Sequence, residues 1–595
     1  MHRNSLRSAL TLVHLMVLGL FATAQEGLPH ELTPEERPLI PAYRDSRAGS
    51  GRGISTPPSF PVRTMAEWEE VQSVVIAWTS FPGILKQIVR AAQAECEVII
   101  ACNDQASVVS YLQNASYGGA IGDLTGITFV ETDFNSIWSR DYMAETIYAN
   151  EVDSLYMLDW IYNRPRPADD DLSDVIGAAK GITVYSTTQA PYDLVHTGGN
   201  FMCDGAGTAF SSELVLEENG ANGDFNQTVR TAAGVDAIMG QFMGIEEGRY
   251  IKMSTLPYDG IHHIDMHMKL LDEETLLVGE FPVGVSDGPQ LESNLQAIIA
   301  NNVSTFGDPY RMVRIPMPPS TGGNYPPNAS YRTYANNVFI NGTVLVPTYR
   351  TEYDTVGLRI LGEALPGYRI IGIDCDSDQN IIAQSGAIHC ITKTIGVADP
   401  LLIRHQPLAD TDNSTEPYTV DAYIRHRSGI ANAQLYWTTD TAAGFASAVM
   451  SAIGNDMWRA DIPAQVGGSE VFYYVEGTAN SGKVQVRPIV APEGWWRFRV
   501  SDISTNLPTG IGPVIAELFP NPTTSLLVIT LAAAKDQQVE VLLTDALGRE
   551  VMPIHRGALP ADQRLFVDLS KLESAPYMVV VRSATGRSTQ RIIKR

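Results

Sequence analysis

Cysteine is scarce in this chain, which has only five in 595 residues. No pair follows the CxxC spacing, and no cysteine–histidine spacing is of the zinc type. The odd number leaves at least one thiol without a partner in its own chain. We therefore expect neither a disulfide scaffold nor a zinc module, and we interpret cysteine here as a chemical rather than a structural residue.

Positive charge is also in short supply. The chain carries 42 Lys and Arg against 67 Asp and Glu, which gives a formal net charge of −25. A field of that sign repels nucleic acid and anionic membranes and mildly favours cationic substrates. We therefore do not expect nucleic acid as a partner.

Long apolar runs are absent after the first 21 residues. Arg3 and Arg7 accompany an apolar run over residues 9–21, and Ala22-Thr-Ala24 follows it. This order predicts a secretory signal peptide over residues 1–24, with the mature chain starting near Gln25. No later run approaches the length of a membrane span. We expect an exported, soluble protein with no transmembrane segment.

The length of the chain predicts three or more domains. Residues 25–60 are rich in proline and predict an extended leader. Between residues 61 and 397, short β-rich runs alternate with segments at helical spacing such as Ile84–Ala94, which indicates an α/β domain. The β-rich runs include Ser73–Trp78, Cys96–Ala101, Ile127–Val130, Thr275–Val278, Val338–Ile340, Val344–Val346 and Tyr368–Ile373.

The pattern changes to β structure from residue 398 onwards. Residues 398–501 alternate apolar and polar positions in short segments such as Thr419–Ile424, Ala433–Trp437 and Val471–Val475. About seven such strands in a hundred residues predict an immunoglobulin-like β-sandwich. A linker rich in Ser, Thr, Pro and Gly then leads to a small β-rich module over residues 514–595.

The residues that suggest chemistry lie in the α/β part. Segment Ser385–Cys390 places one thiol after a small-residue turn, and His263, Asp265 and Asp141 stand far upstream. A thiolate can attack a guanidinium carbon, an imidazole can move protons, and carboxylates can hold a planar cation. On a strand, His263, Asp265 and His267 would share one face. A three-ligand metal site on that face is therefore an alternative.

These segments resemble those of the guanidino-modifying enzymes, and most of all the Porphyromonas-type peptidylarginine deiminases, which are relatives of agmatine deiminase. The resemblance rests on Trp138–Tyr142, His196–Asp204, Ile261–Leu270 and Gly386–Thr392. It implies that residues 61–397 form a pseudo-fivefold α/β-propeller with a central active site. It also implies catalysis without a cofactor or a catalytic metal, and it leaves a structural calcium or sodium ion open.

The resemblance assigns roles to the four chemical residues. Cys390 is the expected nucleophile, and Asp141 and Asp265 are expected to hold the guanidinium from its two sides. His263 is expected to protonate the departing ammonia. It would then draw a proton from the water that hydrolyses the thiouronium intermediate.

Other assignments are less direct. Asn336 matches an active-site asparagine, with the adjacent Asn337 as the alternative counterpart. Gly199 belongs to a segment whose glycines are expected to let the backbone approach the ligand. His389 is expected to be structural, because adjacent side chains of an extended segment point to opposite faces.

Arg164 and Arg166 each precede a proline, which favours an extended backbone. The resemblance implies that their guanidinium groups clamp the α-carboxylate of a C-terminal arginine, a group that agmatine lacks. A solvated basic turn is the alternative. Trp138 is expected to lie against the alkyl stem or the cation of the substrate, with core packing as the alternative.

The last module resembles the C-terminal sorting domain of the type IX secretion pathway of Bacteroidetes. It opens with Phe519–Pro522, continues with Asp545–Arg549, and ends in a basic strand up to Lys594. The resemblance implies the type IX machinery as a partner. It also implies a protein that is secreted or attached to the outer-membrane surface.

The sequence therefore predicts hydrolytic deimination of peptidyl-arginine, preferably C-terminal arginine, to citrulline and ammonia. One alternative is a deiminase of agmatine or another small guanidine. Export and the pair Arg164 and Arg166 argue against it. The other alternative is a catalytically inactive surface adhesin. The intact set of Cys390, His263 and the two carboxylates argues against that.

Overall fold

The computed structural model describes residues 27–48, 52–501, 514–532, 537–559, 563–584 and 586–595. The expected signal peptide, residues 1–24, lies outside the described residues. No helix in the described part of the chain is long and apolar enough to cross a membrane.

The described part of the leader is not extended throughout, so that prediction was wrong. The 3₁₀ helix η1 (Arg37–Leu39) runs into helix α1 (Ile40–Ala48). Pro38 and Pro41 lie in the first turns of these helices, where the missing N–H would have had no intrahelical partner. Two of the prolines that suggested an extended segment, Pro38 and Pro41, therefore mark the starts of helices.

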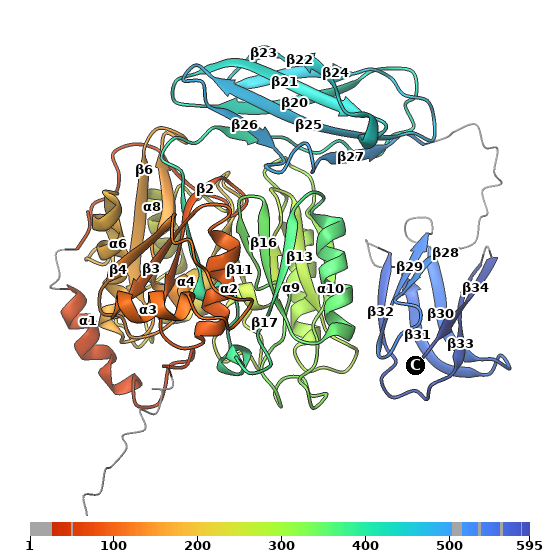
Figure 1. Cartoon of the computed structure of the whole chain (residues 1–595), viewed down its shortest axis with the longest axis horizontal. Helices are drawn as coiled ribbons and strands as arrows, with labels where there is room; N and C mark the ends of the chain where they lie inside the picture. The colour runs from red at the N-terminus through yellow and green to blue at the C-terminus, as the bar shows by residue number, and fades with distance from the viewer. Residues whose placement is uncertain (1–26, 49–51, 502–513, 533–536, 560–562, 585) are drawn as a thin grey trace, which may run out of the picture.

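The α/β part contains five separate sheets (Figure 1). Each combines parallel and antiparallel pairing, and the parallel neighbours are joined by helical crossovers, as parallel strands require. The first sheet consists of β18 (Lys393–Gly396), β2 (Val71–Ala77), β3 (Glu97–Cys102) and β4 (Ile127–Glu131). The second consists of β1 (Val62–Thr64), β5 (Glu145–Ala149), β6 (Leu155–Tyr162) and β7 (Val184–Thr187), with β8 (Val195–His196) beside β6.

The other three sheets have three strands each, one antiparallel pair followed by one parallel pair. They consist of β9 (Met202–Cys203), β10 (Ala209–Ser212) and β11 (Tyr250–Met253); of β12 (Met268–Leu270), β13 (Thr275–Glu280) and β14 (Arg311–Pro316); and of β15 (Val338–Ile340), β16 (Thr343–Thr348) and β17 (Arg369–Asp374). The strands predicted from the sequence are confirmed.

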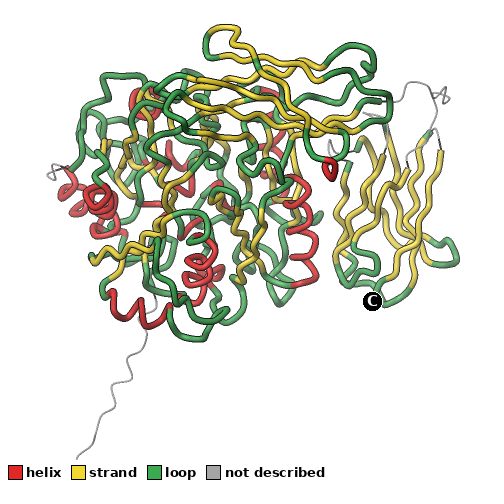
Figure 2. The backbone as a smooth tube through the Cα atoms, turned by 45° about the horizontal axis from the view of Figure 1, so that its top comes forward, coloured by secondary structure: helices red, strands yellow, loops and turns green. Residues whose placement is uncertain are grey.

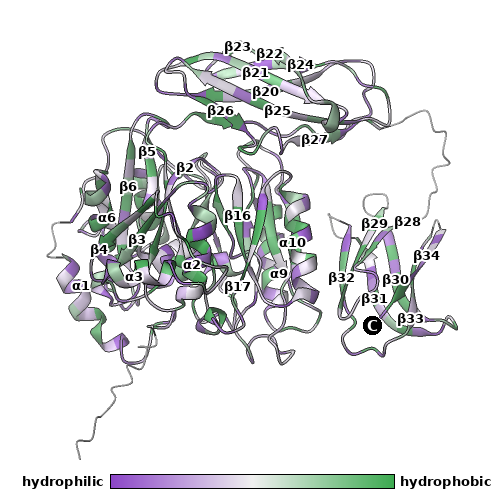
Figure 3. Ribbon diagram, in the orientation of Figure 1, coloured by the Kyte–Doolittle hydropathy of each residue, from purple (hydrophilic) through white to green (hydrophobic). Residues whose placement is uncertain are grey.

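Helices cover the sheets and short 3₁₀ turns connect them. The helices are α2 (Pro82–Ala92), α3 (Gln105–Leu112), α4 (Ser139–Tyr142), α5 (Pro167–Asp170), α6 (Leu172–Lys180), α7 (Leu214–Glu218), α8 (Ala232–Met243), α9 (Gly288–Asn301) and α10 (Thr351–Ala364). The turns that matter for the site are η2 (Gly198–Asn200), η3 (Ile264–Met266), η4 (Ile381–Gln384) and η5 (His389–Ile391). Apolar residues dominate the central strands (Figure 3).

The end of the α/β part returns to its beginning. Strand β18 pairs antiparallel with β2, although the two are more than three hundred residues apart in the chain. This pairing holds the segment just before β18 against the first sheet. Cys390 lies in that segment.

Residues 402–499 form a β-sandwich of two antiparallel sheets. One sheet contains β19 (Leu402–Arg404), β20 (Tyr418–Arg425), β24 (Met457–Ile462) and β23 (Ser451–Gly454); the other contains β22 (Ala446–Val449), β21 (Ile430–Thr438), β25 (Glu470–Ala479) and β26 (Val484–Arg487), with β27 (Trp496–Arg499) beside β25. Val420, Leu435 and Val475 are buried in the core that the sheets share.

The C-terminal module is a second, smaller pair of antiparallel sheets. One sheet contains β28 (Val514–Phe519), β29 (Leu526–Ala532) and β32 (Arg564–Asp568). The other contains β31 (Glu550–Ala558), β30 (Gln538–Asp545), β33 (Pro576–Ser583) and β34 (Gly586–Ile593). Their core includes Leu527, Val541 and Val579.

The sandwich lies across one end of the α/β part, and the C-terminal module lies beside α10 (Figures 1 and 2). Lys483–Glu70 and Arg487–Glu273 ion pairs connect the sandwich to the α/β part. Arg359–Glu517 and Arg564–Glu363 ion pairs connect the C-terminal module to α10.

Candidate active site

Cys390 lies in η5 and is fully buried. Asn336 Nδ2 donates to its sulfur at 3.1 Å, and the sulfur lies 3.6 Å from Asp265 Oδ2. Burial, followed by the negative charges of Asp265 and Asp141, raises the pKa of Cys390 well above its usual value. The thiol is therefore protonated in this structure, and a cation beside it would favour the thiolate.

Three other predicted residues surround the space next to Gly199. A Cβ on Gly199 would lie 2.5 Å from His263 Nδ1, 2.9 Å from Asp141 Oδ1 and 3.3 Å from Asp265 Oδ2. The Gly199 N–H donates to Asp141 Oδ1 at 3.1 Å. Glycine at this position therefore keeps open the space between one imidazole and two carboxylates.

His263 and Asp265 do not lie on a strand, so that part of the prediction was wrong. Asp265 is in the 3₁₀ turn η3, and β12 begins only at Met268. His262 has a φ of 56°, a left-handed conformation that interrupts an extended run. A tight turn, rather than strand alternation, brings the two side chains to the same space.

The imidazole of His263 is fully buried and neutral. Its Nδ1 lies 3.5 Å from Asp141 Oδ1, and neither ring nitrogen has a hydrogen-bond partner among the described residues. Burial lowers the pKa of His263 to about 3, against the opposing effect of Asp141. His263 is therefore an unprotonated base with both nitrogens unengaged.

His389 orients Asp265. Its Nδ1 lies 2.7 Å from Asp265 Oδ2, and its Nε2 lies 2.5 Å from Glu67 Oε1. The segment is a 3₁₀ turn rather than extended, so the reason given from the sequence was wrong. Even so, the imidazole lies between two carboxylates and positions Asp265, which is consistent with the expected structural role.

Glu67 was missed by the sequence reading. It forms ion pairs with Lys269 and Arg140, the second at 3.3 Å, and these cations together with His389 outweigh burial and hold the pKa of Glu67 well below its usual range. Its partners are remote in the chain, so no motif spacing marks it. Glu67 anchors the hydrogen-bonded row that ends at Asp265.

Of the two candidate asparagines, Asn336 contacts the sulfur. Its Oδ1 also accepts from the backbone N–H of His389 at 3.0 Å. The Asn337 side chain donates instead to the carbonyl of Tyr334. The structure therefore distinguishes two neighbours that the sequence left open.

Trp138 and Asp141, at the start of α4 and within it, contact the leader. The His30 ring stacks on Trp138 with centroids 4.2 Å apart and 9° between the planes. His30 Nε2 lies 2.5 Å from Asp141 Oδ2. Although burial raises the pKa of Asp141, the His30 ring, through its charge and its hydrogen bond, holds that pKa well below its usual range. Asp141 is therefore ionised.

Arg164 and Arg166 also contact the leader. Arg164 Nε donates to the carbonyl of His30 at 3.1 Å. Arg166 holds the Glu36 carboxylate through Nε at 2.6 Å and a second guanidinium nitrogen at 3.1 Å. Both arginines are buried, so the alternative of a solvated turn was wrong.

Candidate metal ligands converge in one place within the described residues, at His30, Asp141 and His263. The alternative set of His263, Asp265 and His267 does not converge in this way. Two ligand atoms around a tetrahedral zinc ion are about 3.3 Å apart, given bonds of about 2.0 Å. The 2.5 Å between His30 and Asp141 is therefore a hydrogen bond rather than a pair of metal ligands.

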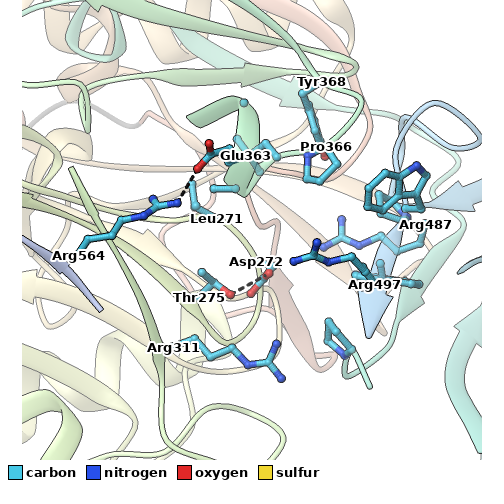
Figure 4. Close-up of a pocket in the computed structure, with 17 residues that line it drawn as sticks. Leu271, Asp272, Thr275, Arg311, Glu363, Pro366, Tyr368, Arg487, Arg497 and Arg564 are labelled. Atoms are coloured by element: carbon cyan, nitrogen blue, oxygen red, sulfur yellow. Dashed lines mark hydrogen bonds and ion pairs between the residues drawn. The ribbon is translucent and has the colours of Figure 1, made fainter. Parts of the chain in front are cut away.

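A cavity of about 630 Å³ lies elsewhere, where the α/β part, the sandwich and the C-terminal module meet (Figure 4). None of the predicted site residues lines it. Its arginines are each paired with a glutamate, in the pairs Arg311–Glu274, Arg487–Glu273, Arg497–Glu470 and Arg564–Glu363. This cavity is a junction between modules rather than part of the site.

The residues around Gly199 and Cys390 fall within a known family pattern. The family model described as Porphyromonas-type peptidyl-arginine deiminase matches residues 63–395. The chain belongs to this family. Members are guanidino-group deiminases, so the protein is an enzyme of the class that acts on guanidino C–N bonds. The match contains every predicted catalytic and substrate-binding residue.

A second family model, described as a secretion system C-terminal sorting domain, matches residues 517–595. The type IX sorting prediction is confirmed. A domain of this kind implies a deiminase that is secreted or attached to the outer-membrane surface.

Relatives of this deiminase carry the provisional name agmatine deiminase. One from Vibrio parahaemolyticus is 24% identical over 296 residues, 45% of this chain and 78% of its own. One from Marinomonas sp. is 22% identical over 362 residues, 56% of this chain and 94% of its own.

Solved structures are also similar to part of the chain. A substrate-bound agmatine deiminase from C. jejuni is 19% identical with a TM-score of 0.46, over 57% of this chain and 97% of that one. The Enterococcus faecalis agmatine deiminase is 17% identical with a TM-score of 0.47, over 57% of this chain and 99% of that one.

Proposed function

We propose that this enzyme is a peptidylarginine deiminase that converts C-terminal arginine to citrulline and ammonia. The arrangement around Gly199 carries the proposal, because two carboxylates and an imidazole face one small space beside the Cys390 thiol. Asp141 and Asp265 supply the charge that a guanidinium requires. The surrounding burial removes the competing water.

In the proposed reaction the guanidinium of the substrate also activates the nucleophile. Its positive charge offsets the carboxylates that raise the thiol pKa, so Cys390 loses its proton to His263 and attacks the guanidinium carbon. The C–N bond then breaks, and His263 returns the proton to the departing ammonia. Water attacks the thiouronium carbon as His263 accepts one of its protons. The C–S bond breaks, the sulfur takes the other proton of the water, and the thiol and citrulline are formed. His263 then passes its proton to the ammonia, which leaves as ammonium.

The contact between Arg166 and Glu36 supports a carboxylate-bearing substrate. Arg166 grips that carboxylate with two nitrogens, the geometry expected for a free α-carboxylate. Agmatine has no such group. Deimination of agmatine is the second candidate, because relatives carry that name.

We also propose the finer architecture expected from the sequence. The five sheets would be the blades of a pseudo-fivefold propeller over residues 61–397. The repeated parallel pair with its helical crossover and the pairing of β18 with β2 support this. Residues 398–501 would be an immunoglobulin-like domain and residues 514–595 the sorting domain.

The direct test is citrulline formation from four substrates: matched peptides with C-terminal arginine, its amide, and internal arginine, and agmatine. The assay uses both the parent chain and the His30→Ala variant, so that the leader cannot hide activity. Preference for the free C-terminal arginine supports the proposal. Preference for agmatine would replace it with the second candidate, and no citrulline from any substrate would favour the inactive adhesin.

We predict that Arg164→Ala/Arg166→Ala removes the preference for a free carboxylate. Hydrogen bonds that involve charges contribute roughly 1.5–3 kcal/mol each. In the His30→Ala background, kcat/KM for C-terminal arginine should therefore fall about ten- to several-hundred-fold. Values for the amide and for internal arginine should change little. Equal losses on all peptides would show that these arginines support the fold instead.

We predict that Gly199→Ala lowers kcat/KM by about a hundredfold or more, because the added methyl group enters the guanidinium space and displaces the reacting groups. Gly362→Ala in α10 is the control, since a Cβ there meets no atom within 4 Å. Both variants should unfold near the parent temperature. Full activity of Gly199→Ala would contradict this position of the substrate.

A further inference from the structure

The leader occupies the space proposed for the substrate. His30 is fully buried, stacked on Trp138, and 4.9 Å edge-on from the ring of His263. It thus contacts the tryptophan, a carboxylate and the histidine of the site at the same time. A substrate guanidinium held by Asp141 could not be present together with this ring.

The hydrogen bonds of His30 give it the chemistry of a guanidinium. Its Nδ1 lies 2.8 Å from the carbonyl oxygen of Ser385, and its Nε2 lies 2.5 Å from the ionised carboxylate of Asp141. Both partners only accept hydrogen bonds, so both ring nitrogens must donate and the ring carries a positive charge. A flat cation with N–H donors on two edges is what the site is proposed to bind.

A second group of the leader matches the other end of the substrate. Glu36 is buried against Arg166. Its carboxylate is bound by the Arg166 guanidinium, the group proposed to hold the α-carboxylate of the substrate. Backbone carbonyls complete the contact: Pro29 accepts from Arg166 at 2.8 Å and Leu28 accepts from Trp138 Nε1 at 3.0 Å. The leader therefore engages both proposed subsites.

Helix α1 holds this segment in place. Ile40 and Tyr43 are buried in a small cluster with Ile161, Val195 and Phe225. The Tyr43 hydroxyl donates to the carbonyl of Tyr162 at 3.1 Å, and Arg47 forms ion pairs with Asp170 at 3.0 Å and Asp171 at 2.7 Å. These contacts lie outside the reacting groups, so they serve to dock the leader.

We propose that residues 27–48 are a built-in competitive inhibitor, with His30 in the guanidinium subsite and Glu36 in the carboxylate subsite. This proposal rests on the proposed function. The enzyme is then latent until an endoprotease hydrolyses a peptide bond in the segment that follows. Residues 52–60, the last part of the leader before β1, are all exposed or half-buried and offer that site.

The first test compares point variants of the full chain. His30→Ala should raise kcat/KM for an arginine peptide about ten- to a hundredfold, the usual value of a hydrogen bond to a charged group. Glu36→Gln should raise it less. Glu35→Gln is the matched control, because Glu35 is exposed. Loss of activity in His30→Ala would make His30 a catalytic residue and overturn the proposal, as would equal activity of all four proteins.

The second test does not depend on turnover. Alkylation of Cys390 by iodoacetamide, followed by peptide-resolved mass spectrometry, reports whether the site is open. Cys203 and Cys375 serve as internal controls, because both are buried and free. Cys390 should react faster in His30→Ala than in the parent while the controls stay unchanged. If Cys390 is alkylated faster in His30→Ala but that variant forms no citrulline, the inhibitor proposal stands and the proposed function is rejected. If the alkylation rate is unchanged, the inhibitor proposal is rejected.

The third test releases and returns the leader. The recognition sequence of a site-specific protease is inserted between Thr56 and Pro57, and cleavage of the intact protein should raise activity. A synthetic peptide of residues 27–48 should then inhibit competitively against C-terminal arginine, and the peptide with His30→Ala should inhibit at least tenfold more weakly. Equal inhibition by both peptides, or inhibition that substrate cannot relieve, would overturn the assignment of His30 to the guanidinium subsite.

Discussion

Cys390→Ala should abolish citrulline formation on every arginine substrate. The change removes the atom that forms the covalent intermediate, and removal of a nucleophile from a covalent hydrolase costs about 10⁴-fold or more in kcat. The rest of the site should persist, because Asp265 stays hydrogen-bonded to His389 and Asn336 to the backbone of His389. The thermal midpoint should therefore stay close to that of the parent.

The matched control is Cys375→Ala, which removes another fully buried thiol. It should retain turnover. Both variants are measured in the parent and in the His30→Ala background by ammonia release and by mass spectrometry of trapped adducts. Substantial turnover by Cys390→Ala in either background would move the nucleophile to another residue.

His263→Ala should lower kcat about 10²–10⁴-fold, the usual contribution of a general acid–base. His263 can accept a proton because it is neutral in the buried site. Burial lowers its pKa to about 3, so the proton that it takes up is readily passed on to the departing ammonia. Without it, the guanidinium space keeps only the carboxylates of Asp141 and Asp265, which are proposed to hold the substrate rather than to move protons.

His267→Ala is the control, since His267 is a second buried imidazole nearby whose pKa burial lowers to about 4. A mild effect is expected there. If His267→Ala is the crippling change and His263→Ala is mild, the roles of the two histidines are reversed. Activity should also resist EDTA, and its loss on chelation would restore the metal interpretation.

Much of the fold could be predicted from local pattern. Strands such as β2, β3 and β17 are apolar runs with ordinary turn residues between them, so composition and period identified them. The leader was misread because proline disfavours a helix interior but suits its first turn. The conformations around His263 and His389 were misread because a 3₁₀ turn of three residues has no periodic signature.

The sequence by itself determined the module order, the thiol, and the histidine and carboxylates expected around a guanidinium. Those conclusions rest on residue types in short segments, which can be recognised without the tertiary structure. Only the tertiary structure decided that Asn336 rather than Asn337 contacts Cys390, that Glu67 supports Asp265 through His389, and that His30 lies on Trp138. These contacts join residues that are far apart in the chain, and the choice between Asn336 and Asn337 depends on a difference of one position. Their geometry depends on how the separate sheets close around one space, which no local pattern encodes.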